Sequence, residues 1–218
     1  MSAPVGPTGC RATNPADERR PFTIGLSYGS SDTRLIFSNK ERYRFRQSAY
    51  SLSFLATLDN DLVLGAAVGP HMGGRVEGRA DAWVIRPGVV WSFVVARRWF
   101  GTKAQIPYLL VVGTFSGSSA STRRESDGAR AGLHALDFKG DLSVGWTLGE
   151  AWSPYLAVRG FGGPVFWHPD ETRRVGSDLY HVSVAAGFNL TIANRVSVYF
   201  DGAFVGMRGL SGGASVRF

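Results

Sequence analysis

The sequence predicts an all-β chain that folds as a transmembrane, antiparallel, up-and-down β-barrel. The first observation is a long segment, residues 134–149, in which apolar and polar residues alternate with a period of two, the signature of a strand with two unlike faces. The second is that similar alternation recurs along most of the chain. The third is a composition with 28 glycines and 12% aromatic residues, which suits barrels with crowded walls and aromatic girdles.

The alternation in residues 134–149 separates two sets of side chains. One set is His134, Leu136, Phe138, Gly140, Leu142, Val144, Trp146 and Leu148, and the other is Ala135, Asp137, Lys139, Asp141, Ser143, Gly145 and Thr147. The ten residue steps from Leu136 to Trp146 span roughly 33 Å of strand. If the strand is tilted by about 40°, its height along the barrel axis is about 25 Å, which is the height of the apolar band on a membrane barrel. We therefore expect the apolar set to contact lipid and the charged set to face the interior, the reverse of a soluble ligand-binding barrel of the lipocalin type.

Nine further segments are predicted as strands, which gives ten with residues 133–148. They are residues 21–30, 43–58, 62–72, 82–97, 105–116, 152–163, 179–192, 195–206 and 211–218. In the predicted strand at residues 82–97, we expect Ile85, Val89 and Trp91 to face outward and Arg86 to face inward. Pro87 is expected at a bulge or strand margin, because proline has no backbone N–H to donate to the neighbouring strand.

The connections between these segments alternate in length. Long polar loops are expected at residues 31–41, 73–81, 117–131 and 168–178, and most of the other connections are short. Long loops at one end and short turns at the other are typical of outer-membrane barrels. The short connection after the ninth strand breaks the alternation, so eight strands is the alternative to ten.

The rest of the composition limits the class of protein. No run approaches the eighteen or so apolar residues of a spanning helix, and the mean hydropathy is −0.03. Residues 1–20 are rich in Pro, Gly and charge and predict a flexible N-terminal segment, followed by one barrel domain at 21–218. The single Cys10 permits no intramolecular disulfide. No signal peptide is visible, and we expect that one was removed on export.

The pattern resembles that of the small bacterial outer-membrane β-barrels of the opacity, OmpX and OmpA transmembrane type. The motifs that carry the resemblance are the terminal GGASVRF, IPYLLVVG at 106–113 and SPYLAVRGFG at 153–162. The resemblance implies that Phe218 is the signal recognised by the barrel assembly machinery. It implies no shared active site and no cofactor.

Charged residues with inward parity are the candidates for a lumen network. They are Arg86, Asp137, Lys139, Asp141, Arg159, Asp201 and Arg217. The interior of a barrel this size is about filled by side chains, and an unpaired buried charge is costly. We therefore expect these charges to pair and plug the lumen, with Arg86 and Arg159 as partners of Asp137 and Asp141. A narrow channel is the alternative.

His181 and Ser183 share a face of one predicted strand, and Asp201 could lie on the next strand. The pair resembles the catalytic pair of outer-membrane lipid A deacylases, which gives a lipid-modifying enzyme as an alternative function. The acid is displaced from the position that family uses, however, and the pair is expected to face inward. We therefore assign no catalytic residue, and we interpret HPDE at 168–171 as a solvated loop without a metal.

Arginine is concentrated in the predicted long loops and their borders. These residues are Arg42, Arg44, Arg46, Arg75, Arg79, Arg123, Arg124, Arg130, Arg173 and Arg174. The net charge of +7 and pI near 10 would favour nucleic acid in a soluble protein, but these loops lie outside a membrane and no recognition helix is present. Guanidinium groups bind phosphate well. We expect a structural or surface-binding barrel whose Arg123, Arg124, Arg173 and Arg174 contact lipopolysaccharide or an acidic glycan.

Overall fold

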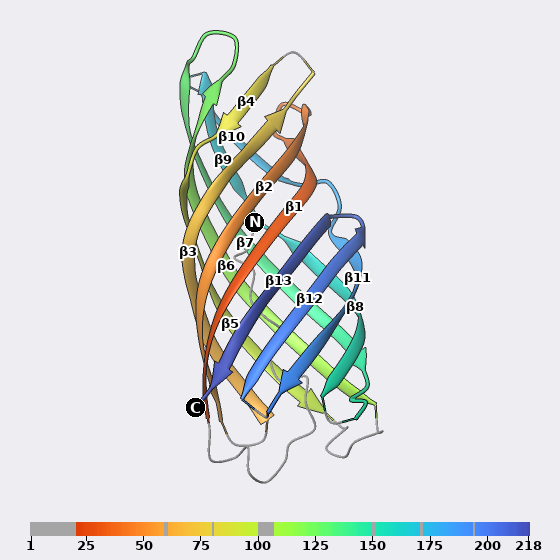
Figure 1. Ribbon diagram of the computed structural model, residues 1–218. Coiled ribbons are helices and arrows are strands. Elements are labelled where there is room, and N and C mark those ends of the chain that lie inside the picture. The colour runs from red at the N-terminus through yellow and green to blue at the C-terminus, as the bar shows by residue number, and fades with distance from the viewer. Residues whose placement is uncertain are drawn as a thin grey trace.

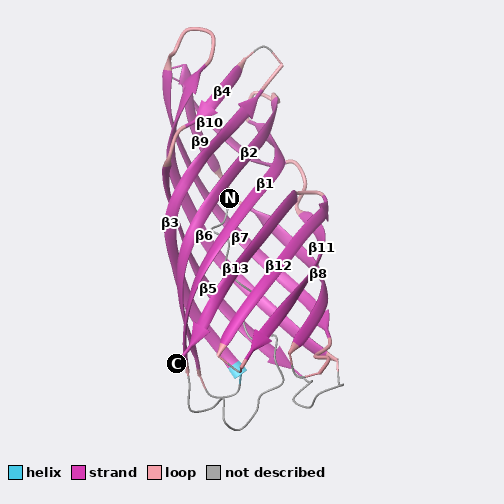
Figure 2. Ribbon diagram, viewed as in Figure 1, coloured by secondary structure: helices cyan, strands magenta, loops and turns pink. Residues whose placement is uncertain are grey.

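The computed structural model describes residues 21–58, 61–79, 81–99, 107–149, 151–170, 172–193 and 195–218. Almost all of these residues are in strands (Figure 2). The strands are β1 (Phe22–Phe37), β2 (Arg42–Thr57), β3 (Leu62–Glu77), β4 (Ala82–Ile85), β5 (Gly88–Trp99), β6 (Tyr108–Arg124), β7 (Arg130–Gly145), β8 (Trp152–Gly162), β9 (Val165–Asp170), β10 (Thr172–Asp178), β11 (Val182–Ile192), β12 (Val196–Val205) and β13 (Arg208–Arg217). Among the described residues, no helix has the length and apolar character needed to cross a membrane.

The barrel is tall and tilted, with unlike ends (Figure 1). The lower end holds both termini of the sheet, where Phe22 and Phe218 exchange two backbone hydrogen bonds of 3.3 and 3.0 Å. The upper end carries the turns at residues 38–41 and 125–129, and it also carries Gly78, Arg79 and Asp81, which lie between β3 and β4. On one side the wall stops early, because the β12–β13 hairpin ends below the level reached by β1, β2 and β3.

The sheet closes as a ring at two levels. In the lower part β1, β2, β3, β5, β6, β7, β8, β11, β12 and β13 pair in that order and β13 pairs with β1, which makes ten strands. In the upper part β10 pairs directly with β1, and the ring is β1, β2, β3, β4, β6, β7, β9 and β10. The predicted ten-stranded barrel is confirmed, and an eight-stranded ring forms its upper extension.

The predicted long polar loops are wrong. Residues 31–37 continue β1, residues 73–77 continue β3, and residues 117–124 and 130–131 belong to the β6–β7 hairpin. The predicted loop at 168–178 lies mostly in β9 and β10. Their polar side chains misled the prediction because they lie on the outer face of strands that have risen beyond the apolar band.

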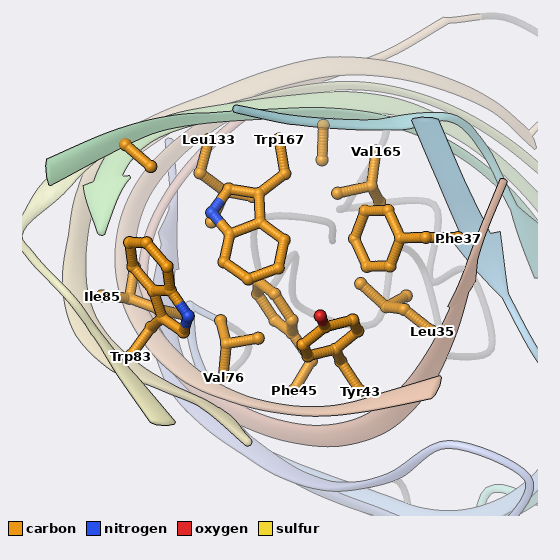
Figure 3. Close-up of a cluster of buried hydrophobic side chains, with 12 residues drawn as sticks. Leu35, Phe37, Tyr43, Phe45, Val76, Trp83, Ile85, Leu133, Val165 and Trp167 are labelled. Atoms are coloured by element: carbon orange, nitrogen blue, oxygen red, sulfur yellow. The ribbon is translucent and has the colours of Figure 1, made fainter. Parts of the chain in front are cut away.

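The inner and outer faces exchange character along the barrel. In the lower part the outward side chains are apolar and exposed, with Phe138 at 64% and Leu156 at 64% exposure. In the upper part the inward side chains are apolar instead and form a buried upper cluster (Figure 3). Its members are Leu35, Phe37, Tyr43, Phe45, Val76, Trp83, Ile85, Ala131, Leu133, Ala135, Val165 and Trp167.

Ile85 is one position where the predicted face is wrong. It is 2% exposed and belongs to the upper cluster, whereas Val84 is 43% exposed on the outer face. The strand is interrupted at residues 86–87, between β4 and β5, where Pro87 was expected to cause a bulge or margin. The interruption shifts the alternation by one residue, so the parity of β5 cannot be extended into β4.

We expect Leu142→Arg to destabilise the barrel by about 2–4 kcal/mol, because a cation near the bilayer midplane loses its hydration. Leu142 is 49% exposed on the outer face of β7, and its neighbour Ser143 is 5% exposed on the inner face. Ser143→Arg is the matched comparison and disturbs only interior packing. Unfolding from lipid vesicles measures both, and lipid-soluble labelling of a cysteine at 143 with protection at 142 would contradict this assignment.

Candidate functional site

A polar layer crosses the lumen between β7, β8 and β12. The Arg159 guanidinium donates two hydrogen bonds to the Asp201 carboxylate, Nη1–Oδ1 at 2.7 Å and Nη2–Oδ2 at 2.6 Å. Tyr155 Oη donates to the same carboxylate at 2.7 Å. On its other side Arg159 Nε lies 3.7 Å from Asp141 Oδ2, which Lys139 Nζ approaches to 3.2 Å. Two-point pairing of this kind is the geometry that a guanidinium and a carboxylate favour.

The polar layer borders a cavity of about 140 Å³ whose lining includes Asp137, Asp178 and His71. The upper cluster lies above this cavity. A second apolar cluster brings together side chains from seven strands, and three of its members, Leu110, Tyr155 and Ala203, also line the cavity. Its members are Leu55, Val63, Ala96, Tyr108, Leu110, Tyr155, Ala157, Ala185 and Ala203. The described lumen therefore holds the polar layer, the cavity beside it and two apolar clusters.

The structure brings some of the predicted lumen charges together and not others. Lys139, Asp141, Arg159 and Asp201 form the polar layer, and Asp137 lines the same cavity at 4% exposure. Arg86 lies in the β4–β5 interruption, where its backbone N donates to Ser121 O, and it makes no ion pair with a described residue. Arg217 lies at the lower end of β13 opposite Thr23.

The three catalytic candidates do not form a hydrogen-bonded group. Ser183 is fully buried on the inner face of β11, whereas His181 precedes that strand and is exposed rather than inward. His181 Nδ1 lies 3.1 Å from the Phe161 carbonyl oxygen. Asp201 is committed to Arg159 and Tyr155. Among the described residues, no cluster of three or more His, Cys, Asp or Glu side chains that could hold a metal is found, and Glu171 of the HPDE segment lies outside the described residues.

One serine–histidine contact was missed because its serine was assigned to a loop. Ser119 Oγ lies 3.0 Å from His134 Nδ1, and the two residues are direct cross-strand partners on the outer face of β6 and β7. Among the described residues no carboxylate makes an ion pair with His134 that could orient the ring as a third catalytic group does. The backbone amides beside the pair are engaged in the strand ladder.

Arginines also gather on the outer face of the upper part, where cross-strand partners run from β13 to β7. The row is Arg208, Asp32, Arg46, Arg75, Val84, Arg123 and Arg130, and we call it the arginine girdle. All five arginines are exposed. The girdle lies close above the apolar band, since Arg46 is four residues beyond the exposed Tyr50 on β2, about 13 Å of strand.

Acidic residues neutralise only one section of the girdle. Asp32 lies 3.4 Å from Arg46, and Arg75 lies 2.8 Å from Glu125 and 3.5 Å from Glu77. Three hydrogen bonds from Arg44 lower the pKa of the Asp32 carboxyl, so it stays ionised. By contrast, Arg123 and Arg130 stand directly opposite each other and neither makes an ion pair with a described residue.

The four arginines predicted to bind glycans have two kinds of environment. Arg123 is exposed, and so is Arg173, whose guanidinium lies 4.6 Å from the Phe166 ring centre. Arg124 is half-buried, 4.5 Å from the Trp83 ring centre and 3.0 Å from Asp127. Arg174 lies 2.8 Å from Glu41. Sequence reasoning could not separate these two kinds, because the separation depends on cross-strand register.

Comparisons with solved structures define the class of protein. Outer membrane protease OmpT from Escherichia coli has a TM-score of 0.57 at 10% identity, over 91% of this chain and 97% of that chain. The translocator domain of autotransporter NalP from Neisseria meningitidis has a TM-score of 0.50 at 12% identity, over 91% of this chain and 88% of that chain. No protein-family model and no curated protein sequence matches. The chain thus has the fold of the bacterial outer-membrane β-barrel proteins, as the sequence resemblance implied.

Proposed function

We propose that this protein is an integral barrel of the bacterial outer membrane with a plugged lumen, and that its arginine girdle binds phosphate groups of lipopolysaccharide. The function is structural or surface-binding rather than catalytic. Phe218, 52% exposed at the lower end, serves as the signal for the barrel assembly machinery. The TM-score of 0.57 with OmpT supports a common fold, and at 10% identity it does not extend that protein's proteolysis to this chain.

The single observation that carries this proposal is the pair formed by Arg123 and Arg130. Like charges directly opposite each other on neighbouring strands are destabilising, and the described residues supply no acid for this pair. An external anion between the two guanidinium groups removes the repulsion and forms charge-assisted hydrogen bonds. On β7, Arg130 is six residues beyond the exposed Leu136, about 20 Å of strand. A tilt of about 40° reduces this to about 15 Å above the apolar band, which places the pair among charged headgroups.

The test of the girdle is Arg123→Gln combined with Arg130→Gln. We expect association with lipopolysaccharide at low salt to weaken about three- to tenfold, because exposed ionic contacts contribute about 0–1 kcal/mol each. Binding to immobilised lipopolysaccharide across a salt series measures the effect. Heat-modifiable gel mobility should be unchanged, which shows that the barrel still folds.

Arg97→Gln with Arg195→Gln is the matched control, since it removes the same charge from exposed residues near the lower end. The control should bind lipopolysaccharide as the native chain does. If both double variants lost the same amount of lipopolysaccharide binding, net charge alone would explain the effect. If the girdle variant lost no binding, the proposed site would be refuted.

A further inference from the structure

A second basic site lies at the top of the barrel, above the upper cluster. Here the β1–β2 turn, the β3–β4 turn and β10 enclose a cavity of about 510 Å³, which we call the mouth pocket. Its rim includes Asn39, Lys40, Glu41, Arg42, Arg79, Asp81 and Arg174. Its lining also includes Tyr43, Trp83 and Trp167 of the upper cluster (Figure 3). A cavity of this size is within the range of small-molecule sites.

Glu41 is held in place by three donors that converge on one oxygen. Its Oε2 accepts hydrogen bonds from Asn39 Nδ2 at 2.7 Å, Tyr43 Oη at 2.7 Å and Arg174 Nη1 at 2.8 Å. These bonds lower the pKa of the Glu41 carboxyl, while burial and Glu41 raise the pKa of Tyr43 to about 12. The network is therefore fixed in one protonation state at neutral pH, and it ties the β1–β2 turn to β10.

The second acid of the pocket also faces an arginine that lies deeper. Asp81 Oδ2 is 4.0 Å from Arg124 Nε, and the Arg124 guanidinium stacks on Trp83. Both acids are thus directed at Arg174 and Arg124. Lys40, Arg42 and Arg79 are exposed at the rim and make no ion pair with a described residue. The pocket presents three cations whose charge its own carboxylates do not neutralise.

The polar groups of the rim suit a sugar better than a simple anion. The cations can bind a carboxylate or phosphate, while the Asn39 amide and the second oxygen of Glu41 can bond to hydroxyl groups. A carboxylate inside a basic pocket repels a bare polyanion but accepts hydroxyl donors. The pocket is also distant from the membrane, because Arg42 is eight residues beyond Tyr50, about 26 Å of strand.

We propose that the mouth pocket binds an anionic saccharide of one or two sugar units, presented from outside the cell. The site uses Lys40, Arg42 and Arg79 for the anionic group and Asn39 and Glu41 for hydroxyl groups. It shares none of these residues with the arginine girdle. Failure of one site therefore leaves the other untouched.

The test is calorimetric titration of the detergent-solubilised full chain with glucose 6-phosphate, galacturonate, glucose and inorganic phosphate. We expect both anionic sugars to bind, glucose to show no binding, and inorganic phosphate to bind at least tenfold more weakly than glucose 6-phosphate. Arg42→Gln with Arg79→Gln should weaken the binding of both anionic sugars at least tenfold. The girdle variant, Arg123→Gln with Arg130→Gln, should bind them as the native chain does.

Each other outcome overturns the proposal in a defined way. Equal affinity for inorganic phosphate and glucose 6-phosphate would mean simple anion attraction without sugar recognition. Equal affinity for glucose would exclude a role for the three cations. Loss of sugar binding in the girdle variant would show that the sugar binds at the outer wall and not in the mouth pocket. If no probe bound to the chain while its heat-modifiable mobility was intact, a saccharide site would be excluded.

Discussion

Arg159→Ala is expected to lower the free energy of unfolding by about 3–5 kcal/mol, because it leaves a buried carboxylate without its counter-ion. Asp201 is 5% exposed and takes two of its hydrogen bonds from Arg159. Asp141 loses its 3.7 Å contact with Arg159 and keeps Lys139 as its ion-pair partner among the described residues. Denaturant-induced unfolding from lipid vesicles, followed by tryptophan fluorescence, measures the loss.

A double variant separates the cost of the unpaired charge from the cost of lost packing. Arg159→Leu with Asp201→Leu removes both charges, and replacing a buried ion pair by apolar side chains is often neutral or stabilising. We expect it to recover most of the stability that Arg159→Ala loses. A single variant as stable as the native chain would show that Asp201 is hydrated and that the polar layer does not close the lumen.

Trp167→Ala is expected to cost about 3–5 kcal/mol, since it empties the centre of the upper cluster. Trp167 is fully buried, its ring centre lies 5.1–5.6 Å from those of Phe37, Tyr43 and Trp83, and its Nε1 donates to Thr122 Oγ1 at 3.0 Å. The same unfolding experiment measures the effect.

Trp167→Phe keeps a ring in place and loses only part of the volume and the Thr122 hydrogen bond. We expect its stability to lie between those of the native chain and Trp167→Ala. If Trp167→Ala and the native chain unfold at the same denaturant concentration, the upper cluster does not stabilise the eight-stranded extension.

The membrane part of this fold could be predicted from sequence because its outward residues stay apolar over a whole strand. In β7 the set from Leu136 to Trp146 keeps one parity and one character, as the structure shows. The upper part could not be predicted in the same way. Along β1, Leu26 and Tyr28 face outward, but Leu35 and Phe37 face inward. Where the apolar side changes within a strand, the alternation cancels and the polar outer residues resemble a loop.

The candidate sites also could be predicted only in part, because the alternation within one strand does not show which residues of different strands meet. Inward parity identified Arg159 and Asp201, but their partnership depends on the barrel closing β8, β11 and β12 side by side. Arg86 was misassigned because one interruption of its strand changes the parity that the sequence implies. The arginine girdle is defined by cross-strand register between residues as distant in sequence as Arg208 and Asp32. The spacing of residues within one strand carries no information on that register.

Planar-bilayer recording of the purified native chain is the most direct test of a lumen that is plugged by paired charges and apolar clusters. We expect little or no steady conductance, because the described lumen holds one polar layer and two apolar clusters around a cavity of about 140 Å³. A large, stable and reproducible open channel from the pure protein would contradict it.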